Sequence, residues 1–331
     1  MKESLKAHFL QALSARTDML ETEHVVALRL FNGFYEGIPE LVVDLYARTL
    51  VLFNYGKESS PPNNMLADAQ SILLDAYPWV ETVIHKKRYV RDLALRKGVI
   101  TFGKSPAQQI SEFDVHYALD LLINQDASFY LDTRNLRRWL LDHAAGWQVL
   151  NMFAYTGSLG VAALAAGANR VVQGDRSRKF LAMARQSAML NRLDLGKMKT
   201  SAVDFFRQIS QLKTSGDLFD CVILDPPFFS TTSKGKVDQV NESVRLINKV
   251  RPLIRDGGYL VAINNALFLS GADYMGSLEK LCADGYLSVE TLIPIPLDMT
   301  GYPHTIVNPA PSDPAPFNHP TKIAVLRVRR R

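Results

Sequence analysis

Short apolar runs of strand length dominate the first hundred residues of the chain. Their apolar residues alternate or cluster at 25–31, 41–46, 49–55, 80–85 and 98–102. Between the third and fourth runs, residues 65–76 have the apolar spacing of an amphipathic helix, which follows the loop KESSPPNN. We therefore expect a small α+β domain over residues 1–112.

From about Asp132 onward, apolar strands alternate with amphipathic helices. Strands are expected at 147–153, 170–174, 199–202, 220–224, 258–264, 287–295 and 322–328, with helices at 133–143, 158–166, 177–191, from 204, 241–254 and 271–283. Strands separated by helices form a parallel, doubly wound sheet with right-handed crossovers. The long connection before residue 322 indicates that the last strand enters the sheet out of sequential order. Residues 113–123 also alternate, and we expect them to be a strand leading into this larger domain, residues 113–331.

The composition is that of a globular protein with no sign of a membrane or an oxidising compartment. Of the 331 residues, 47% are apolar and 21% are charged, which excludes a wholly disordered chain. No apolar run approaches the roughly 20 residues of a membrane-spanning helix, and the N-terminal segment lacks the apolar core of a secretory signal. Two cysteines are too few for a disulfide framework or a four-ligand zinc site. The sequence therefore predicts a cytoplasmic protein without a metal centre.

Positive charge is in slight excess and is unevenly distributed. The chain has 38 Lys and Arg residues against 33 Asp and Glu residues, a formal net charge of +5. One basic run contains Lys86, Lys87, Arg88, Arg91, Arg96 and Lys97, with Tyr89 inside it as an aromatic group on which a base can stack, and the chain ends in RVRRR. Such a run is either a solvated charged face or a contact for RNA phosphates.

The first strand of the larger domain runs into a glycine-containing turn at the start of a helix. This segment, NMFAYTGSLG at 151–160, lacks the GxGxxG pattern of dinucleotide-binding domains. A turn of this kind brings backbone N–H groups and a helix N-terminus close to a polar or anionic ligand. The next strand ends at Asp175, whose carboxylate can accept both hydroxyls of a ribose. A turn glycine and a helix-capping Asp explain each piece separately, but their spacing favours an adenosine-containing cofactor.

Asp204, just beyond the third strand, has two interpretations. It can meet an adenine amino group, or it can cap the helix that begins at Phe205.

The most specific motif is DPPFF at 225–229, directly after the apolar strand at 220–224. Two consecutive prolines cannot extend a hydrogen-bonded ladder, so they fix the backbone at the edge of the sheet. There a planar base can stack on the aromatic pair while Asp225 contacts its polar edge.

Taken together, NMFAYTGSLG, Asp175 and ILDPPFF resemble the class I S-adenosylmethionine-dependent methyltransferases, which have a Rossmann-like, mostly parallel seven-stranded sheet. The resemblance covers about residues 30–328, and it is greatest to bacterial large-subunit rRNA methyltransferases with a small α+β domain before the cofactor domain. The segment FYLDTR at 129–134 is similar to their F-L-D-x-R element, and FNG at 31–33 with LVVD at 41–44 is similar to their central domain. We expect no amino-terminal PUA domain, because the chain begins too late to carry one.

This resemblance implies S-adenosyl-L-methionine as the cofactor and RNA, rRNA in particular, as the partner. The cofactor-binding residues that it implies are Tyr130, Arg134, Asn151, Phe153, Tyr155, Thr156, Gly157, Ser158, Asp175, Arg176, Ser177, Asp204, Phe205 and Asp225. The catalytic residues that it implies are Asp225, Pro226, Pro227, Phe228 and Asn265.

Two branches of this group methylate different atoms. The cytosine-C5 branch carries a nucleophilic Cys after the fifth strand, where this chain reads AINNA at 262–266. The guanine-N7 branch has Ser-Asn-Asn there, preceded by D-P-P-x-F-S-x-S-K. This chain matches with Asn264-Asn265, Ser230 and Ser233-Lys234, and Ile263 replaces the serine.

N7 of guanine loses no proton when it is methylated, so in-line positioning of the base supplies most of the acceleration. We therefore expect direct methyl transfer to a base nitrogen, guanine N7 in particular, without a catalytic cysteine. Methylation of a protein side chain or a small molecule, and methylation of cytosine C5, stay open as alternatives. The intact turn glycines, Asp175 and DPPFF argue against a further alternative, an RNA-binding module whose cofactor fold has lost its function.

Residues 294–320 contain eight of the sixteen prolines of the chain. This stretch is either a passive connector or one wall of the substrate crevice.

Overall fold

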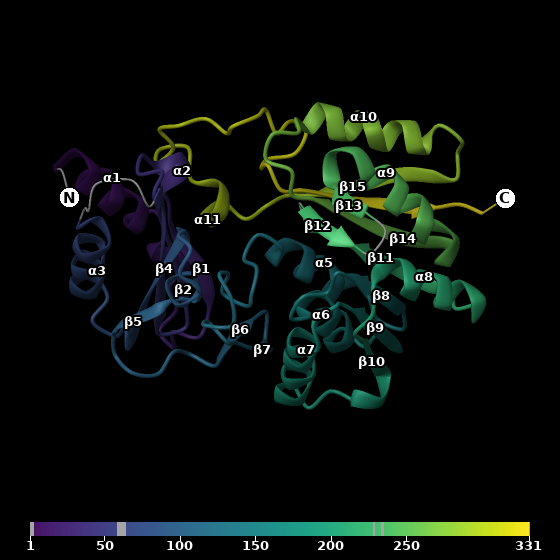
Figure 1. Ribbon diagram of the computed structural model, residues 1–331, viewed down its shortest axis with the longest axis horizontal. Helices are drawn as coiled ribbons and strands as arrows, with labels where there is room; N and C mark the ends of the chain where they lie inside the picture. The colour runs from purple at the N-terminus through teal and green to yellow at the C-terminus, as the bar shows by residue number, and fades with distance from the viewer. Residues whose placement is uncertain (1–2, 58–63, 228, 233–234, 331) are drawn as a thin grey trace. The chain divides into compact units, whose positions relative to one another are not determined.

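The computed structural model of the protein describes residues 3–57, 64–227, 229–232 and 235–330, which form two compact units (Figure 1). The first unit comprises Met1–Leu131 and Pro296–Pro309, and the second comprises Asp132–Ile295 and Ala310–Arg331. This division differs from the boundary predicted from the sequence, between residues 112 and 113, for two reasons. A hairpin after residue 108 belongs with the first unit, and a segment distant in sequence returns to it.

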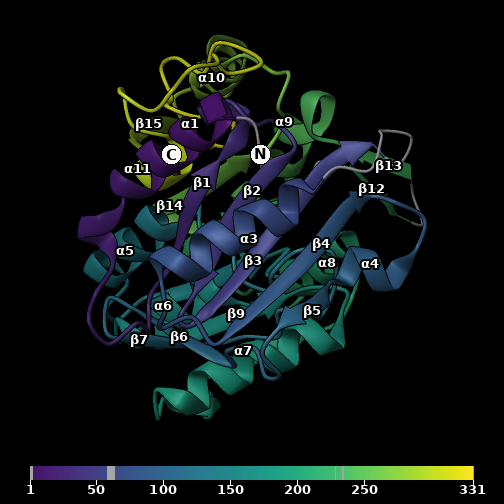
Figure 2. The same cartoon turned by 90° about the vertical axis from the view of Figure 1, so that its left-hand side faces the viewer.

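The first unit is built on a five-stranded sheet with the order β1-β2-β3-β4-β5. Its strands are β1 (Ala27–Asn32), β2 (Leu41–Tyr46), β3 (Thr49–Lys57), β4 (Thr82–Tyr89) and β5 (Val99–Phe102), of which β3 and β4 pair in parallel and the other neighbours antiparallel. Its helices are α1 (Glu3–Ser14), η1 (Thr17–Met19), α2 (Gly33–Glu36), α3 (Met65–Ala76), α4 (Leu93–Lys97) and α11 (Leu297–Thr300). Helix α3 lies across one face of the sheet (Figure 2), where Leu66, Ala69 and Leu73 join the buried core. The predicted small α+β domain is confirmed.

A β-hairpin stands where the sequence predicted a strand leading into the larger domain. β6 (Gln109–Glu112) and β7 (Val115–Ala118) pair antiparallel, joined by Phe113 and Asp114 with φ of 54° and 61°. Two left-handed residues in succession are typical of a type I′ turn, but Phe-Asp lacks the Asn-Gly or Asp-Gly signature of that turn. The expected strand over 113–123 is confirmed only at Val115–Ala118, and it lies inside the first unit and does not lead into the larger domain.

A buried ion pair holds the returning segment in the first unit. Arg16 Nη1 and Glu36 Oε1 lie 2.9 Å apart, and both side chains are 0% exposed. Arg16 also donates to the backbone carbonyl of Asp298, and Glu36 accepts a 2.6 Å hydrogen bond from the hydroxyl of Thr305. The first half of the proline-rich stretch is therefore a structural part of the first unit, which neither interpretation from the sequence anticipated.

The second unit contains a seven-stranded sheet with the order β10-β9-β8-β11-β14-β16-β15. Its strands are β8 (Gln148–Met152), β9 (Arg170–Gly174), β10 (Met198–Ser201), β11 (Phe219–Leu224), β14 (Ile254–Asn264), β15 (Leu287–Ile293) and β16 (Lys322–Val328). The first five in that order pair in parallel, whereas β16 pairs antiparallel with both β14 and β15. The predicted mostly parallel sheet is confirmed, as is the late entry of the last strand.

Helices cover both faces of this sheet, as a doubly wound fold requires (Figure 1). They are α5 (Arg134–His143), α6 (Ser158–Ala165), α7 (Arg178–Leu190), η2 (Leu195–Lys197), α8 (Phe205–Thr214), α9 (Gln239–Val250), η3 (Arg251–Leu253) and α10 (Gly271–Cys282). Apolar side chains of α8, α9 and α10 form one core with the sheet, and α6 packs against β8 and β9. In the part of the chain that the structure describes, no helix has the length and apolar character needed to cross a membrane.

The segment after the double proline forms a hairpin that the sequence did not predict. β12 (Phe229–Thr232) pairs antiparallel with β13 (Gly235–Asp238), and α9 follows directly. The expected helix over 241–254 ends earlier, at Val250, because Pro252 has no N–H to continue the α-helical hydrogen bonds, and the chain goes on as the short 3-10 helix η3.

We expect Glu36→Gln to lower the free energy of unfolding by about 3–5 kcal/mol, because it leaves the guanidinium of Arg16 buried without its counter-charge. Urea denaturation followed by circular dichroism measures the loss. Glu81→Gln is the matched control, since Glu81 forms an exposed ion pair with Arg48 whose removal costs about 1 kcal/mol or less. Equal losses in the two variants would contradict the role assigned to the buried pair.

Candidate functional site

Several parallel strands of the second unit end at one edge of the sheet. Met152 of β8 is in register with Gly174 of β9 and with Leu224 of β11, and Gly174 is in register with Ser201 of β10. The candidates selected from the sequence follow these strand ends, at the edge where open α/β sheets bind ligands.

The turn after β8 has an unusual backbone. Phe153, Tyr155 and Gly157 all have positive φ, of 58°, 51° and 78°. Left-handed residues other than glycine are strained, and such strain is common at ligand sites. A Cβ on Gly157 would lie 2.5 Å from the Cβ of Ala184, so both the φ and the packing of α6 against α7 require glycine. The half-buried Ser158 then begins α6, and the buried Thr156 lies inside the turn.

Asp175 ties this turn to the next one. Its Oδ2 accepts from the backbone N–H of Tyr155 at 2.9 Å, and its Oδ1 accepts from that of Ser177 at 2.8 Å. Burial raises the pKa of Asp175, although these hydrogen bonds and the N–H of the exposed Arg176 act in the opposite direction. Ser177 also caps α7 by accepting from the N–H of Phe180. Asp175 thus stands half-buried between two strand ends, where a ribose acceptor is expected.

Asn151 provides an unsatisfied acceptor close to the same turn. Its amide donates to Gln173 Oε1 at 2.8 Å, and Gln173 Nε2 donates to the carbonyl of Gly157 at 3.0 Å. Within the described structure, the buried Oδ1 of Asn151 has no hydrogen-bond partner. A buried acceptor of this kind calls for a donor, and the ammonium of a methionine moiety can supply one. The residues here therefore fit S-adenosylmethionine.

Asp204 is a helix cap in this structure. Its Oδ1 accepts from the N–H of Phe206 at 3.0 Å, at the start of α8. The neighbouring Phe205 is buried and stacks on Phe153, with ring centroids 5.1 Å apart and planes 17° from parallel. The capping interpretation is confirmed, and the contact of Asp204 with adenine stays a prediction.

Asp225 and Asn265 meet at the ends of β11 and β14. The amide Nδ2 of Asn265 donates to Asp225 Oδ1 at 3.1 Å. After Asp225, Pro226 is buried and Pro227 is exposed. Phe228, the predicted stacking residue, lies outside the described residues. The structure therefore brings together the polar half of the catalytic set named from the sequence.

The carboxyl group of Asp225 titrates far from its ordinary range. Desolvation by the surrounding protein, reinforced by the negative charge of Asp132, raises its pKa to about 7, while the hydrogen bond from Asn265 acts in the opposite direction. Asp132 itself accepts from the hydroxyl of Thr321 at 3.1 Å. A carboxyl group with a pKa near neutrality can act as a hydrogen-bond donor, as an acceptor or as a base, depending on pH.

Two residues near Asn265 were missed in the sequence. The buried ammonium of Lys322 donates to the carbonyls of Ala266 and Pro320 at 3.0 and 2.6 Å, so β16 holds the segment that carries Asn265. Phe268, three residues after Asn265, is 80% exposed. A single Lys in a strand and a single Phe before a helix belong to no sequence motif, so no signal marked Lys322 or Phe268. Asp132, which raises the pKa of Asp225, does belong to a motif, the FYLDTR element.

Two of the cofactor-binding residues that the resemblance implies, Tyr130 and Arg134, belong to different units. Tyr130, 43% exposed, lies in the first unit, where its hydroxyl donates to Asp126 Oδ2 at 3.4 Å. Arg134 is the first residue of α5 in the second unit. Their joint action on the cofactor stays a prediction.

Three of the six basic residues of the run at 86–97 are engaged within the first unit. Lys86 is buried and donates to the carbonyls of Asn124 and Asp126, and burial lowers its pKa to about 7. Arg88 pairs with Asp126 at 2.8 Å, and Arg96 donates to the side chain of Gln125. Lys86 is therefore not accessible to RNA phosphates, and Arg88 is already paired with Asp126. Consecutive residues of a strand point to opposite faces, so a charged run in β4 cannot lie on one surface.

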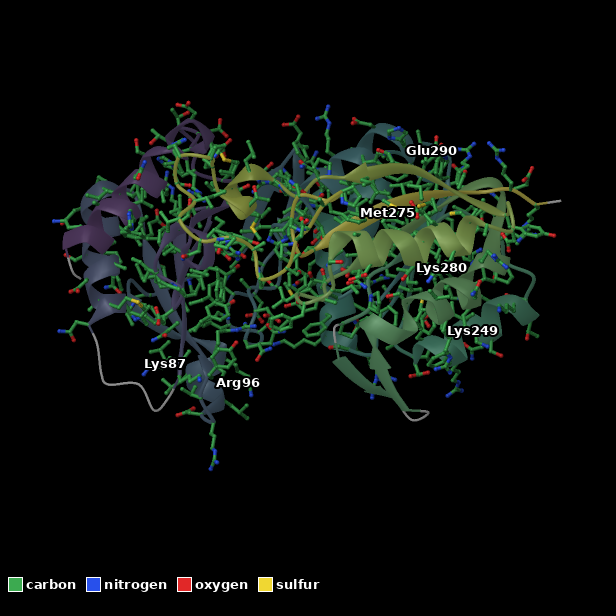
Figure 3. The ribbon with its side chains drawn as sticks, turned by 90° about the horizontal axis from the view of Figure 1, so that it is seen from above. Lys87, Arg96, Lys249, Met275, Lys280 and Glu290 are labelled. Carbon is green, nitrogen blue, oxygen red and sulfur yellow. The ribbon has the colours of Figure 1, made fainter. Side chains whose placement is uncertain are left out.

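Three residues of the run, Lys87, Arg91 and Lys97, are exposed. Lys87 is labelled in Figure 3, together with the partly buried Arg96. An RNA contact through these three residues stays a prediction.

Both cysteines lie in regular elements. Cys221 is buried in β11, and Cys282 is the half-buried last residue of α10. Burial raises the pKa of both thiols, so the nucleophilic thiolate is disfavoured at neutral pH.

Comparison with known proteins gives a consistent result. A family model described as S-adenosylmethionine-dependent methyltransferase matches residues 75–292. The ribosomal RNA large subunit methyltransferase I of Yersinia pseudotuberculosis serotype O:1b is 30% identical over 284 residues, covering 84% of this chain and 69% of that protein. The protein of the same name from Aeromonas salmonicida is 29% identical over 282 residues, covering 83% and 69%. A methyltransferase crystal structure in complex with SAH has a TM-score of 0.83 at 21% identity, covering 98% of this chain and 81% of that chain.

We expect Asp175→Ala to weaken binding of S-adenosylhomocysteine by about 1–3 kcal/mol, the scale of a lost hydrogen bond to a charged group. Isothermal titration calorimetry measures the change. Asp194→Ala is the matched control, because Asp194 also accepts from a backbone N–H, that of Gly196 at 2.8 Å, but lies beyond α7 and away from the strand ends. Unchanged affinity in Asp175→Ala would remove Asp175 from the cofactor site.

Proposed function

This chain belongs to the S-adenosylmethionine-dependent methyltransferase family, and from that premise we propose that it methylates ribosomal RNA at a base nitrogen, with guanine N7 as the favoured acceptor. The curated relatives that share four fifths of the chain are named for large-subunit ribosomal RNA. Their name supports RNA over a protein side chain or a small molecule as the substrate. The positive net charge of the chain agrees with a polyanionic partner.

The observation that carries the proposal for a nitrogen acceptor is the pairing of Asp225 with Asn265 at adjacent strand ends. A guanine presents a carbonyl oxygen beside N7 and N–H groups on its other edge. Asn265 is the donor suited to the carbonyl, because it is partly exposed at the strand end, whereas Asn264 is fully buried. Asp225 in its ionised form accepts from an N–H of the base.

The cofactor supplies a methyl group on a positively charged sulfur. The protein then has to hold the base nitrogen in line with that methyl group, and orientation supplies most of the rate. The carbonyl of Ala266, next to Asn265, is fixed by Lys322, and Asp225 is followed by two prolines, so both polar groups stand on restrained backbone. The base must leave its stack to reach this edge of the sheet.

A second candidate is a nitrogen that carries a proton, either in the ring or in an exocyclic amino group. The pKa of about 7 at Asp225 favours it, because a carboxylate of that basicity can accept a proton near neutral pH. Cytosine C5 has less support. It requires a thiolate at the base, and the two thiols lie within β11 and α10 with raised pKa values.

We expect purified protein to methylate protein-free large-subunit rRNA, and nucleoside mass spectrometry of the product to show 7-methylguanosine. The double variant Cys221→Ala, Cys282→Ala should give the same product, because no thiol takes part. The appearance of 5-methylcytidine, or of a covalent RNA adduct that this variant abolishes, would establish the cytosine-C5 alternative. Methylation of protein with no methylation of any RNA would refute the proposal as a whole.

The pH dependence separates the two nitrogen candidates. If N7 is the acceptor, Asp225 only binds the base. In that case kcat/KM for RNA should rise about tenfold between pH 6 and 8, as the carboxyl group ionises through pH 7, while kcat stays flat. In Asp225→Asn the rise should vanish and kcat should persist. A kcat that itself rises with pH, and that collapses in Asp225→Asn, would identify Asp225 as a base and the acceptor as a protonated nitrogen.

A further inference from the structure

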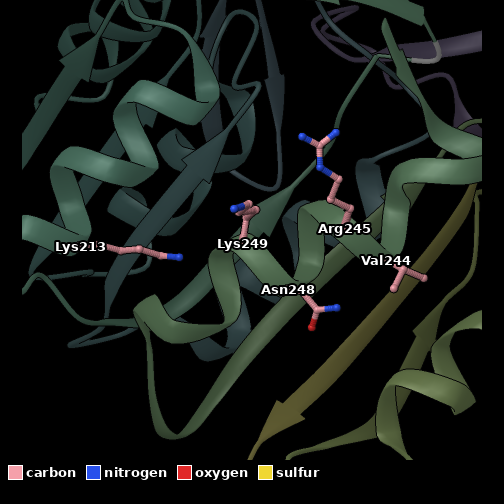
Figure 4. Close-up of a pocket in the computed structure, with 5 residues that line it drawn as sticks. All are labelled: Lys213, Val244, Arg245, Asn248 and Lys249. Atoms are coloured by element: carbon pink, nitrogen blue, oxygen red, sulfur yellow. The ribbon is translucent and has the colours of Figure 1, made fainter. Parts of the chain in front are cut away.

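Helices α8 and α9 enclose a surface cavity of about 510 Å³ that the site described above does not use. Figure 4 shows the residues that line it, which are Lys213 from α8 and Val244, Arg245, Asn248 and Lys249 from α9. Three of these five side chains are cationic and none is acidic. The cavity is therefore a concentrated positive site on the second unit.

In the part of the chain that the structure describes, the two lysines of the cavity face each other without a counter-ion. Their ammonium groups point toward one another from the last turns of the two helices (Figure 4). Among the described residues, neither forms an ion pair or a hydrogen bond. Partial burial together with the positive charge of Lys249 lowers the pKa of Lys213. The repulsion between the two groups is thus uncompensated within the described chain.

Elsewhere in the same unit, arginines pair with acids. Ion pairs join Arg170 to Asp217, Arg255 to Asp220, Arg251 to Asp284 and Arg138 to Asp142. Two adjacent lysines with no acidic partner among the described residues depart from that pattern. An anion bound between them would relieve their repulsion.

Arg245 connects the cavity with the sheet edge that carries the candidate site. Its guanidinium lies 5.2 Å from the ring centroid of Phe206, whose backbone N–H is capped by Asp204. Arg245 and Lys249 are four residues apart, so they follow one another along the same face of α9. A row of positive charge therefore leads from the start of α8, next to the strand ends, to the last turns of both helices.

We propose that this cavity binds phosphates of the RNA backbone and guides the RNA toward the ends of the β-strands, where the base is methylated. The inference rests on the proposed function, namely that the substrate is RNA. Lysine, arginine and asparagine side chains are common phosphate ligands, and contacts of this kind position a strand without reading its sequence. The partly exposed Val244 adds an apolar surface against which a sugar can pack.

The test compares two triple variants that lose the same charge. Lys213→Gln, Arg245→Gln, Lys249→Gln removes the cations of the cavity. Arg185→Gln, Lys197→Gln, Lys280→Gln removes three exposed cations outside it (Lys280 is labelled in Figure 3). Binding of a single-stranded oligoribonucleotide of mixed sequence is measured from 50 to 300 mM salt. Titration with S-adenosylhomocysteine checks that both variants remain folded.

In the cavity variant we expect affinity for the oligoribonucleotide to fall on the order of tenfold at low salt. The slope of log K against the logarithm of the salt concentration should become less steep by about 2. The control variant should keep nearly the parent slope, and both should bind S-adenosylhomocysteine like the parent. Equal slopes in the two variants, with RNA bound and methylated by the parent, would overturn the cavity proposal alone. If the cavity variant keeps the RNA slope but loses binding to polyglutamate, the cavity takes an acidic protein, which also overturns it. Failure of the parent to bind any RNA would instead refute the proposed function.

Discussion

Parallel pairing of β9, β8 and β11 is the constraint on which the candidate site depends. The register aligns Gly174, Met152 and Leu224, so the chain leaves the sheet at the same level in three separate places. The residues that follow, Asp175, Phe153 and Asp225, are distant in sequence but neighbours at one edge. Each strand is buried over most of its length, so a shift of register would disrupt the packing of the core as well as the alignment of the strand ends.

Two carboxylates at this edge have different surroundings and suit different tasks. Asp175 accepts from backbone N–H groups of two turns, which hold it in place as an acceptor for a hydroxyl-bearing ligand. Asp225 faces a second carboxylate, Asp132, and receives one hydrogen bond from Asn265, so its charge is poorly stabilised. A carboxylate whose position is fixed by two backbone donors suits binding of a hydroxyl-bearing ligand, whereas a carboxyl group with a pKa of about 7 suits a site where its charge changes with pH.

The elements of the second unit could be predicted because their signals are local. Apolar runs, glycines and the double proline set the strand ends to within a few residues, and the polar candidates stand directly beyond them. What could not be predicted depends on contacts between distant residues. Lys86 was taken as exposed because its run is charged, but the carbonyls that hold it, of Asn124 and Asp126, lie almost forty residues later. The lysines of the cavity, Lys213 and Lys249, have no shared motif, and only the packing of α8 beside α9 brings them together.

The return of residues 296–309 to the first unit bears on how the chain folds as it is made. Arg16 and Glu36 emerge early from the ribosome, but their partners Asp298 and Thr305 follow after most of the second unit. At roughly 5–20 residues per second, the interval between residues 131 and 309 is about 10–35 s. During that time the first unit must keep a buried charge pair without the segment that completes its shell. The first unit can therefore reach its complete structure only after most of the second unit has been made.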